Sequence, residues 1–226
     1  MGIVLQSTFD NISIVDLTIQ NTRIQHVSSY GIRAAYSKIS GYNNLITNCG
    51  ISAITLEGGG DYMFYQTTIA NWFAYNSRST PSVYFTNFVD FKDQHGKDSA
   101  TVVRDLDNAY FGNCIIYGGN QSEIAWGENT KGVMNFKFEN CLVKYDTSLN
   151  KLPADHFTNC INYQDPLFLN TGPEKYNFHF DTTKVSPARD LGKFEIGNAY
   201  PTDLDGVSRI ADGKPDAGAY EFLLPE

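Results

Sequence analysis

Phe111-Gly112-Asn113-Cys114 returns as Phe138-Glu139-Asn140-Cys141, with 27 residues separating the two asparagines. The same order of an apolar residue, a variable residue and an asparagine recurs on both sides of this pair, with gaps of 16 to 27 residues between successive asparagines. A repeat of roughly 20–30 residues is typical of a solenoid, in which each repeat buries its apolar face against its neighbours. The other copies are Ile19-Gln20-Asn21, Ile46-Thr47-Asn48, Ile69-Ala70-Asn71, Phe85-Thr86-Asn87 and Phe157-Thr158-Asn159.

Short strand-like runs lie between the asparagines. Met134-Asn135-Phe136-Lys137-Phe138 alternates apolar and polar residues, which indicates a strand with one buried face. Turn sequences such as Gly58-Gly59-Gly60-Asp61 separate the runs, and no helical period is found between residues 10 and 165. The pattern predicts an all-β fold, a single-stranded right-handed parallel β-helix, with a β-sandwich or propeller as the alternative. We expect coils over residues 1–161, as the C-terminal part of a longer solenoid, and an irregular cap over residues 162–226 on the last coils.

Each recurring asparagine is expected at a tight turn, because asparagine tolerates the left-handed backbone region that most residues avoid. We predict one corner where these residues stack and where their amides bond between coils. The short gap of 16 residues makes Asn87 the member that fits least well. The predicted corner residues are Asn21, Asn48, Asn71, Asn87, Asn113 and Asn140.

All four cysteines, Cys49, Cys114, Cys141 and Cys160, directly follow an asparagine of the repeat. They are expected to point into the core and to pack as small hydrophobic side chains in a single row. Neighbouring coils lie about 4.8 Å apart, which nearly permits disulfides, but parallel side chains favour reduced thiols. The spacings match no CxxC-type metal site.

The bulk properties restrict the partners. A net charge of −8 argues against nucleic acid and makes polyanionic glycans difficult ligands. No run approaches the roughly 20 apolar residues that span a bilayer, so we expect a chain that does not cross a membrane. Met1-Gly2-Ile3-Val4 is no signal peptide, which leaves a cytoplasmic protein or a piece of an exported one. We favour an extracellular or outer-membrane surface location, with the signal or lipid anchor removed or upstream, because strand-like sequence begins at once and an open solenoid end is normally covered.

The last third of the chain carries a further motif. Asp165-Pro166-Leu167-Phe168, Ser186-Pro187-Ala188 and Asp216-Ala217-Gly218-Ala219-Tyr220-Glu221-Phe222 resemble the terminal segment of secreted right-handed β-helix surface proteins of Gram-negative bacteria. The resemblance extends upstream through Asn48-Cys49-Gly50 and Tyr110-Phe111-Gly112-Asn113-Cys114, and so covers most of the chain. It implies a pectin-lyase-like fold, shared with pectate-lyase-like enzymes, and an exported, often lipoprotein, location. It implies no catalytic residues.

Two aromatic stretches are candidates for glycan contact. Sugar binding needs aromatic platforms together with a few planar hydrogen-bonding groups. Trp72, Tyr75 and Arg78 lie in one run, and Trp126 lies in a second. The alternative for these aromatic residues is packing beneath loops.

A charged loop is the other candidate site. Lys92, Asp93 and His95 could supply a base and a charge stabiliser, and the alternative is a solvated loop. Asp203-Leu204-Asp205-Gly206 resembles the start of a calcium loop, but Lys214 stands where the twelfth-position glutamate belongs, so we predict no metal site. Arg209 is expected to pair with an aspartate nearby: Asp205, Asp212 or Asp216.

Three functions remain open from the sequence. The first is a carbohydrate-interacting surface protein that is not catalytic and needs no cofactor. The second is a polysaccharide lyase or glycoside hydrolase, where Ca²⁺ would be expected only for a polyuronide lyase. The third is a structural adhesin stalk. We favour the first, because residues such as Lys38 and Lys92 form no convincing set of acids or bases on one face.

Overall fold

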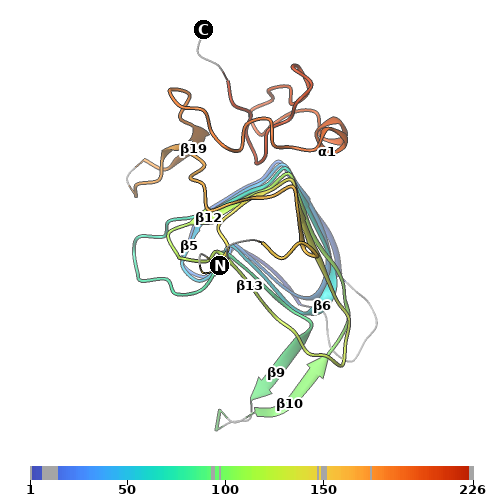
Figure 1. The fold of residues 1–226 in the computed structure, drawn as a ribbon. Coiled ribbons are helices and arrows are strands. Elements are labelled where there is room, and N and C mark those ends of the chain that lie inside the picture. Colours follow the sequence, from blue (N-terminus) through green and yellow to red (C-terminus); the bar gives the residue numbers. More distant parts are fainter. Residues whose placement is uncertain are drawn as a thin grey trace.

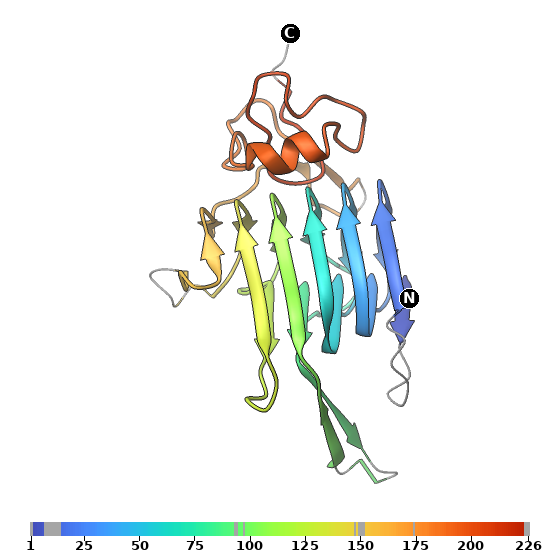
Figure 2. The same ribbon diagram turned by 90° about the vertical axis from the view of Figure 1, so that its right-hand side faces the viewer.

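The computed structural model describes residues 2–6, 15–92, 95–96, 98–146, 148, 152–173 and 175–223. The fold is all-β, and most strands belong to two parallel sheets (Figures 1 and 2). The large sheet contains β1 (Ile3–Gln6), β2 (Val15–Gln20), β4 (Ile32–Tyr42), β6 (Ile54–Tyr65), β8 (Val83–Thr86), β11 (Leu106–Gly112), β13 (Ile124–Gly127), β14 (Met134–Glu139) and β16 (Phe157–Thr158). The small sheet contains β3 (Arg23–Val27), β5 (Leu45–Cys49), β7 (Thr68–Asn71), β12 (Ile115–Gly118), β15 (Leu142–Val143) and β17 (Ile161–Asn162).

The large sheet is bent into two wings, because its longest strands change direction partway. The first part of β6 pairs with β8, and its second part pairs with β11. The bend falls at Gly58, Gly59 and Gly60, whose φ angles of 69°, 79° and 123° strongly favour glycine. Wing A comprises β1, β8, β13 and the first parts of β4 and β6. Wing B comprises β2, β11, β14, β16 and the second parts of β4 and β6.

The chain passes through wing A, wing B and the small sheet in that order, and we call each such pass a rung. Successive rungs overlap in Figure 1, and their strands lie side by side in Figure 2. Every strand pair within the two sheets is parallel, unlike the antiparallel sheets of a β-sandwich. The arrangement is compatible with the predicted parallel β-helix.

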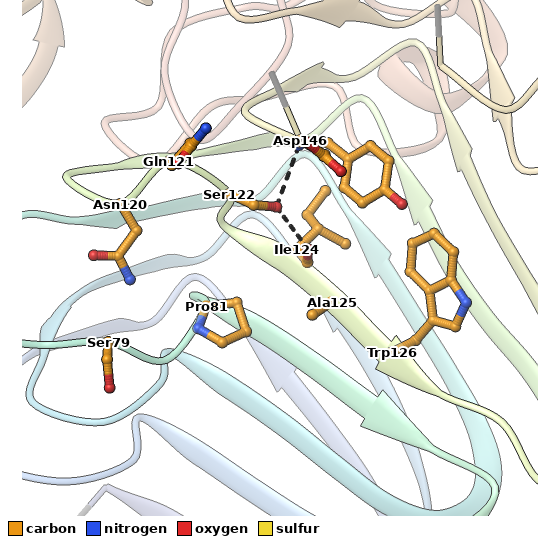
Figure 3. A pocket seen from close by; sticks show the side chains of 10 residues that line it. Ser79, Pro81, Asn120, Gln121, Ser122, Ile124, Ala125, Trp126 and Asp146 are labelled. Carbon is orange, nitrogen blue, oxygen red and sulfur yellow. Dashed lines mark hydrogen bonds between the residues drawn. The ribbon is translucent and has the colours of Figure 1, made fainter. Parts of the chain in front are cut away.

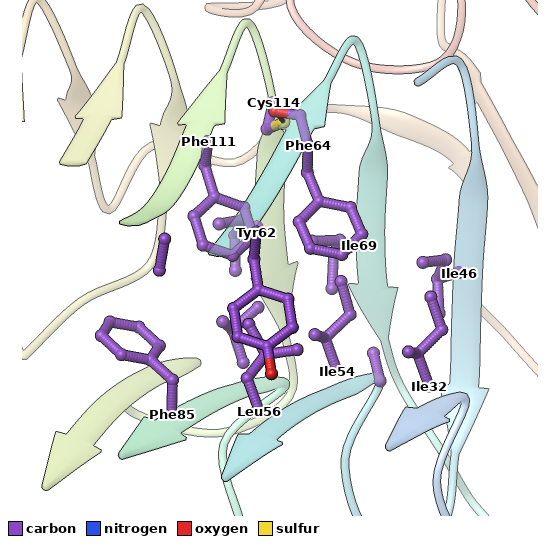
Figure 4. Close-up of a cluster of buried hydrophobic side chains, with 14 of the residues drawn as sticks. Ile32, Ile46, Ile54, Leu56, Tyr62, Phe64, Ile69, Phe85, Phe111 and Cys114 are labelled. Carbon is purple, nitrogen blue, oxygen red and sulfur yellow. Dashed lines mark hydrogen bonds between the residues drawn. The ribbon is translucent and has the colours of Figure 1, made fainter. Parts of the chain in front are cut away.

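A row of phenylalanine rings fills the interior behind wing B. The ring centroids of Phe64 and Phe111 are 5.3 Å apart, those of Phe111 and Phe138 4.9 Å, and those of Phe138 and Phe157 4.8 Å. Figure 4 shows the first two rings among neighbouring isoleucines. Parallel pairing in register places the same residue of each rung in one row. Burying each ring contributes about 1.5–3 kcal/mol, so the row is a large part of the core.

The turn from wing B into the small sheet follows this row by two residues. One residue per rung occupies it, and all six have φ angles between 47° and 56°, in the left-handed region. The backbone N–H of Asn113 donates to the carbonyl of Glu139 in the next rung at 3.0 Å, so the corners align with one another. These corner residues are Asn21, Asn43, Gln66, Asn113, Asn140 and Asn159.

The predicted corner is therefore confirmed for Asn21, Asn113 and Asn140, and wrong for the other three residues. Asn48 does adopt the predicted left-handed backbone, with a φ of 54°, but outside this corner. Asn48 and Asn71 belong to the small-sheet strands β5 and β7, and Asn87 directly follows β8. An apolar residue two positions before an asparagine also occurs where small-sheet strands end, because the core lies behind that sheet as well.

Cys114, Cys141 and Cys160 follow the corner directly and form the predicted row. The backbone N–H of Cys114 lies 3.3 Å from the sulfur of Cys141, and all four cysteines are free thiols. Burial raises the pKa of the Cys141 thiol well above its usual value. Cys49 stands apart from the row, at the end of β5, because Asn48 is not a corner residue. Burial raises the pKa of Cys49 to about 12.

The C-terminal segment, residues 163–223, contains β18 (Phe168–Asn170), β19 (Asn177–Phe180) and the short helix α1 (Phe194–Ala199). It lies along the corner, above several rungs, rather than on the last coils as expected (Figure 2). The outer face of the small sheet explains this position, because it is apolar and must be covered. Phe178 and Ala219 pack there against Leu45 and Ala70, and Phe180 packs in a second cluster that contains Ile115 and Leu142.

Corner side chains bind this segment directly. Asn113 accepts a hydrogen bond from the N–H of Lys193 at 2.7 Å and donates one to the carbonyl of Lys193 at 3.1 Å. Asn140 donates to the carbonyl of Leu191 at 2.8 Å. Arg209 donates to the side-chain oxygen of Asn43 at 2.8 Å. The corner therefore joins the sheets to the C-terminal segment.

Arg209 is fully buried in that segment, and its ion-pair partner differs from those predicted. The guanidinium pairs with Glu221 at 2.7 Å, not with Asp205, Asp212 or Asp216. Asp216 instead accepts backbone N–H groups, and burial raises its pKa to about 6. Glu221 belongs to Gly218-Ala219-Tyr220-Glu221, part of the motif that carries the sequence resemblance. This stretch folds back over the corner, which brings Glu221 to Arg209.

Gly41 occupies the interior row beside Phe64, where a β-carbon would lie 2.6 Å from the Phe64 ring. We expect Gly41→Ala to lower the free energy of unfolding by roughly 1–3 kcal/mol through overpacking, measured by denaturant titration. Gly119→Ala is the matched control, because its nearest neighbour would be 3.9 Å away. Equal effects of the two substitutions would contradict the close packing of this row.

Candidate functional site

An open hollow of about 550 Å³ lies beside β13 (Figure 3). Its wall comes from three separate segments of the chain: the loop before β8, the turn before β13 with the strand itself, and the stretch after β15. Stacking of successive rungs is what brings these segments together. We call this hollow the groove, and its lining residues are Ser79, Pro81, Asn120, Gln121, Ser122, Ile124, Ala125, Trp126, Tyr145 and Asp146.

Two aromatic rings form one side of the groove. Trp126 and Tyr145 are stacked, with centroids 5.4 Å apart and planes 18° apart. Trp126 is also held by Phe85, at 6.2 Å, and by Phe136, at 4.7 Å. Both groove rings remain partly exposed. The exposed part of these fixed rings offers apolar surface to a ligand.

Polar groups form the rest of the lining. Ser122 donates from its hydroxyl to the carbonyl of Ile124 at 2.9 Å and accepts the N–H of Asp146 at 3.3 Å (Figure 3). One carboxylate oxygen of Asp146 accepts the N–H and the hydroxyl of Ser148, at 2.9 and 2.7 Å. These hydrogen bonds lower the pKa of Asp146, so this carboxylate is ionised at neutral pH.

A buried ion pair lies behind the groove. Arg78 and Glu123 meet in a fork, with N–O distances of 2.7 and 2.9 Å, and their side chains are only 4% and 0% exposed. Glu123 also accepts the N–H and hydroxyl of Ser82, at 3.0 and 2.6 Å, and the N–H of Asn120 at 2.8 Å. Five donors thus satisfy one buried carboxylate. The pair joins the loop before β8 to the turn before β13 and fixes the shape of the groove.

This pair corrects the prediction for Arg78. We expected an exposed contact for a glycan or an anion, but the guanidinium is enclosed and fully engaged by Glu123 and the carbonyl of Asn71. Trp126 does line the groove. Tyr75 is 67% exposed on the loop before β8, outside the groove lining, and its glycan contact stays a prediction.

Trp72 packs among other aromatic side chains, which is the alternative given in the sequence analysis. Its ring lies 6.0 Å from Tyr117 and from Phe168 and 6.2 Å from Phe178, between the small sheet and the C-terminal segment. Its carbonyl accepts the hydroxyl of Tyr176 at 3.1 Å. The ring therefore anchors the C-terminal segment.

The charged-loop candidates lie elsewhere. Strands β9 (Phe88–Lys92) and β10 (Asp98–Val103) form an antiparallel hairpin that projects from the sheets (Figure 1). Lys92 and His95 are exposed on it, and Asp93 lies outside the described residues. The groove lining contains neither Lys92 nor His95.

Sequence reasoning missed Glu123, Tyr145 and Asp146. A signal for Glu123 exists, since an acidic residue directly before the apolar strand Ile124–Gly127 needs a partner when it is buried. Glu123 directly precedes β13, where the strand register places it beside Ser82, and Arg78 reaches it from the loop before β8. The inserted hairpin between the two segments hides their adjacency in the sequence.

No family model, curated protein or solved structure gives a significant match to this chain. Within the described residues, no helix has the length and apolar character needed to cross a bilayer. Over the same part of the chain, no cluster of three or more His, Cys, Asp or Glu side chains is arranged to hold a metal ion. The chemistry of the groove is thus the main indication of function.

Removing one partner of the buried pair between Arg78 and Glu123 should destabilise the fold. We expect Arg78→Met to lower the free energy of unfolding by roughly 3–5 kcal/mol, because it leaves the Glu123 carboxylate buried without its counter-charge. Denaturant titration measures this change, and adding Glu123→Gln to Arg78→Met should restore much of the loss.

Lys38→Met is the matched control. Lys38 and Asp61 are 3.8 Å apart with side chains 42% and 32% exposed, so their pair contributes about 0–1 kcal/mol. A loss in Arg78→Met no larger than that in Lys38→Met would show that the pair does not fix the groove.

Proposed function

We propose that this chain is an exported, pectin-lyase-like, right-handed parallel β-helix whose groove beside β13 binds a carbohydrate. The observation that carries the proposal is the stacked pair Trp126 and Tyr145, which shares one hollow with amide, hydroxyl and carboxylate groups. A sugar ring has an apolar C–H face for an aromatic platform and hydroxyl groups for polar partners.

The repeat and the strand register support the β-helix part of the proposal. Aligned corner residues, the phenylalanine row and parallel pairing between rungs are what such a fold requires. The surface location is supported by the resemblance of the C-terminal segment to secreted β-helix proteins. Arg209 and Glu221, which belong to that segment, form one of its buried links.

The charge of the groove favours a neutral glycan. Asp146 is the one ionisable carboxylate among the described lining residues, and none of them is Lys, Arg or His. An ionised Asp146 repels uronates and sulfated sugars, as does the net charge of −8. Hydroxyl groups of a neutral sugar can donate to the same carboxylate.

Binding, rather than cleavage, is the activity that the lining supports. A glycoside hydrolase requires two carboxyl groups on opposite sides of the scissile bond. Glu123 lies beside the segment that carries Asp146, because its N–H donates to the carbonyl of Lys144 at 2.8 Å. Its carboxylate, however, is buried in the pair with Arg78 and accepts from five donors. It is therefore not available to a ligand, and Asp146 acts as a hydrogen-bond acceptor.

Calorimetric titration with neutral and acidic oligosaccharides tests the proposal. We expect dissociation constants in the micromolar to millimolar range for neutral probes, since one aromatic platform contributes little beyond the cost of association. Trp126→Phe and Asp146→Ala should each weaken neutral binding several-fold, and Asp146→Asn should reduce the discrimination against acidic probes.

Tyr75→Ala tests the other predicted contact, because this exposed aromatic residue lies outside the groove. If the groove is the site, the loss of Tyr75 leaves binding unchanged. Binding that depends on Tyr75 and not on Trp126 would place the site elsewhere. Release of reducing ends or of unsaturated uronates would instead identify an enzyme.

A further inference from the structure

A second hollow, of about 240 Å³, lies next to the groove on wing A. Pro81 lines both, so the two hollows meet at this residue. The second hollow is formed by earlier rungs than the groove, and its strands are β6 and β8. Its lining residues are Tyr30, Ile51, Ser52, Thr55, Glu57, Thr80, Pro81 and Tyr84.

One side chain that lines this hollow has a buried hydroxyl without a hydrogen-bond partner among the described residues. Thr55 is only 3% exposed, and its hydroxyl finds no hydrogen-bond partner among the described residues. A buried hydroxyl without a partner is unfavourable, and most buried polar groups in folded proteins are paired. Register explains the position, because Thr55 pairs with Arg33 on one side and with Tyr84 on the other. Thr55 therefore lines the hollow with a buried hydroxyl whose donor and acceptor are unused among the described residues.

The surroundings of Thr55 resemble those of the groove. Tyr30 and Tyr84 provide aromatic surface, and burial raises the pKa of the Tyr84 hydroxyl, which stays protonated at neutral pH. Glu57 provides a carboxylate, held by two nitrogens of Arg33 at 2.8 Å. The Arg33 guanidinium also lies over the Tyr30 ring, 5.2 Å from its centre. Aromatic surface, a hydroxyl and a fixed carboxylate again form one hollow.

We propose that the second hollow is a further sugar subsite, in which a ligand hydroxyl bonds to Thr55 and a ring packs on the tyrosines. This proposal rests on the proposed function, because it assigns the same glycan to both hollows. β13 is two strands from β6 through β8, which is about 10 Å. The glycan is therefore an oligosaccharide that crosses Pro81 and occupies several rungs.

Thr55→Val tests this subsite with little disturbance, because valine keeps the shape and removes a hydroxyl that has no partner among the described residues. The probes are glucose and the malto- and cello-oligosaccharides of two to six units, titrated by calorimetry into the full chain. Affinity should rise with probe length in the wild type. Thr55→Val should lower the affinity of the longest bound probe several-fold, up to about tenfold, and should leave that of glucose unchanged.

Thr18→Val is the matched control, on the exposed side of β2 away from both hollows, and thermal melting should show that neither variant is less stable than the wild type. Length-dependent binding that Thr55→Val does not weaken overturns the second subsite and leaves the groove intact. Binding that Thr55→Val weakens and Trp126→Phe does not supports the second subsite and overturns the groove. Absence of binding by every probe overturns both.

Discussion

A left-handed corner between wing B and the small sheet sets the alignment on which the other features depend. One residue of every described rung adopts it, with φ near 50°, and in each of these rungs but the last its N–H bonds to the next rung. Because the corner residues of successive rungs are aligned, the residues on either side of them are aligned between rungs as well. The residue two positions earlier enters the phenylalanine row, and in the later rungs the residue that follows is a cysteine, buried at Cys114 and Cys141 and partly exposed at Cys160. Asparagine is favoured there, because few other residues tolerate this backbone region.

The same corner has a second role through its side chains. Asn113 and Asn140 bind the backbone of residues 191–193, and Asn43 binds the buried Arg209. The C-terminal segment is therefore held along the stack by groups that the turn geometry already orients. Its apolar residues cover the outer face of the small sheet, so the middle strands β5, β7, β12 and β15 are buried on both sides. Sheets and C-terminal segment form one structure.

How much the sequence could reveal is clear from particular corner residues. Asn113 and Asn140 stand in near-identical surroundings, and their spacing predicts both the repeat and the reduced cysteine row. Asn43 was hidden because Gly41 replaces the apolar residue of the motif, and Gln66 was hidden because glutamine replaces asparagine. Both changes are physically allowed, since Phe64 fills the space beside Gly41, but both remove the letter pattern.

The groove was less accessible to sequence reasoning, because its wall combines segments around residues 80, 123 and 145. Their adjacency depends on the number of rungs, and the inserted hairpin disguises that number. Residue type alone makes Trp126 a candidate, and its glycan contact stays a prediction. The ion pair of Arg78, by contrast, depends on Glu123, a partner on another rung.

The central claim is that the corner backbone aligns the rungs while the corner side chains hold the C-terminal segment. Hydrogen exchange of Asn113→Gly separates these roles, because glycine keeps the positive φ and removes both bonds to Lys193. The account predicts faster exchange in residues 189–199 with unchanged protection in β11 and β12. Equal acceleration in those strands, or an unchanged C-terminal segment, would contradict it.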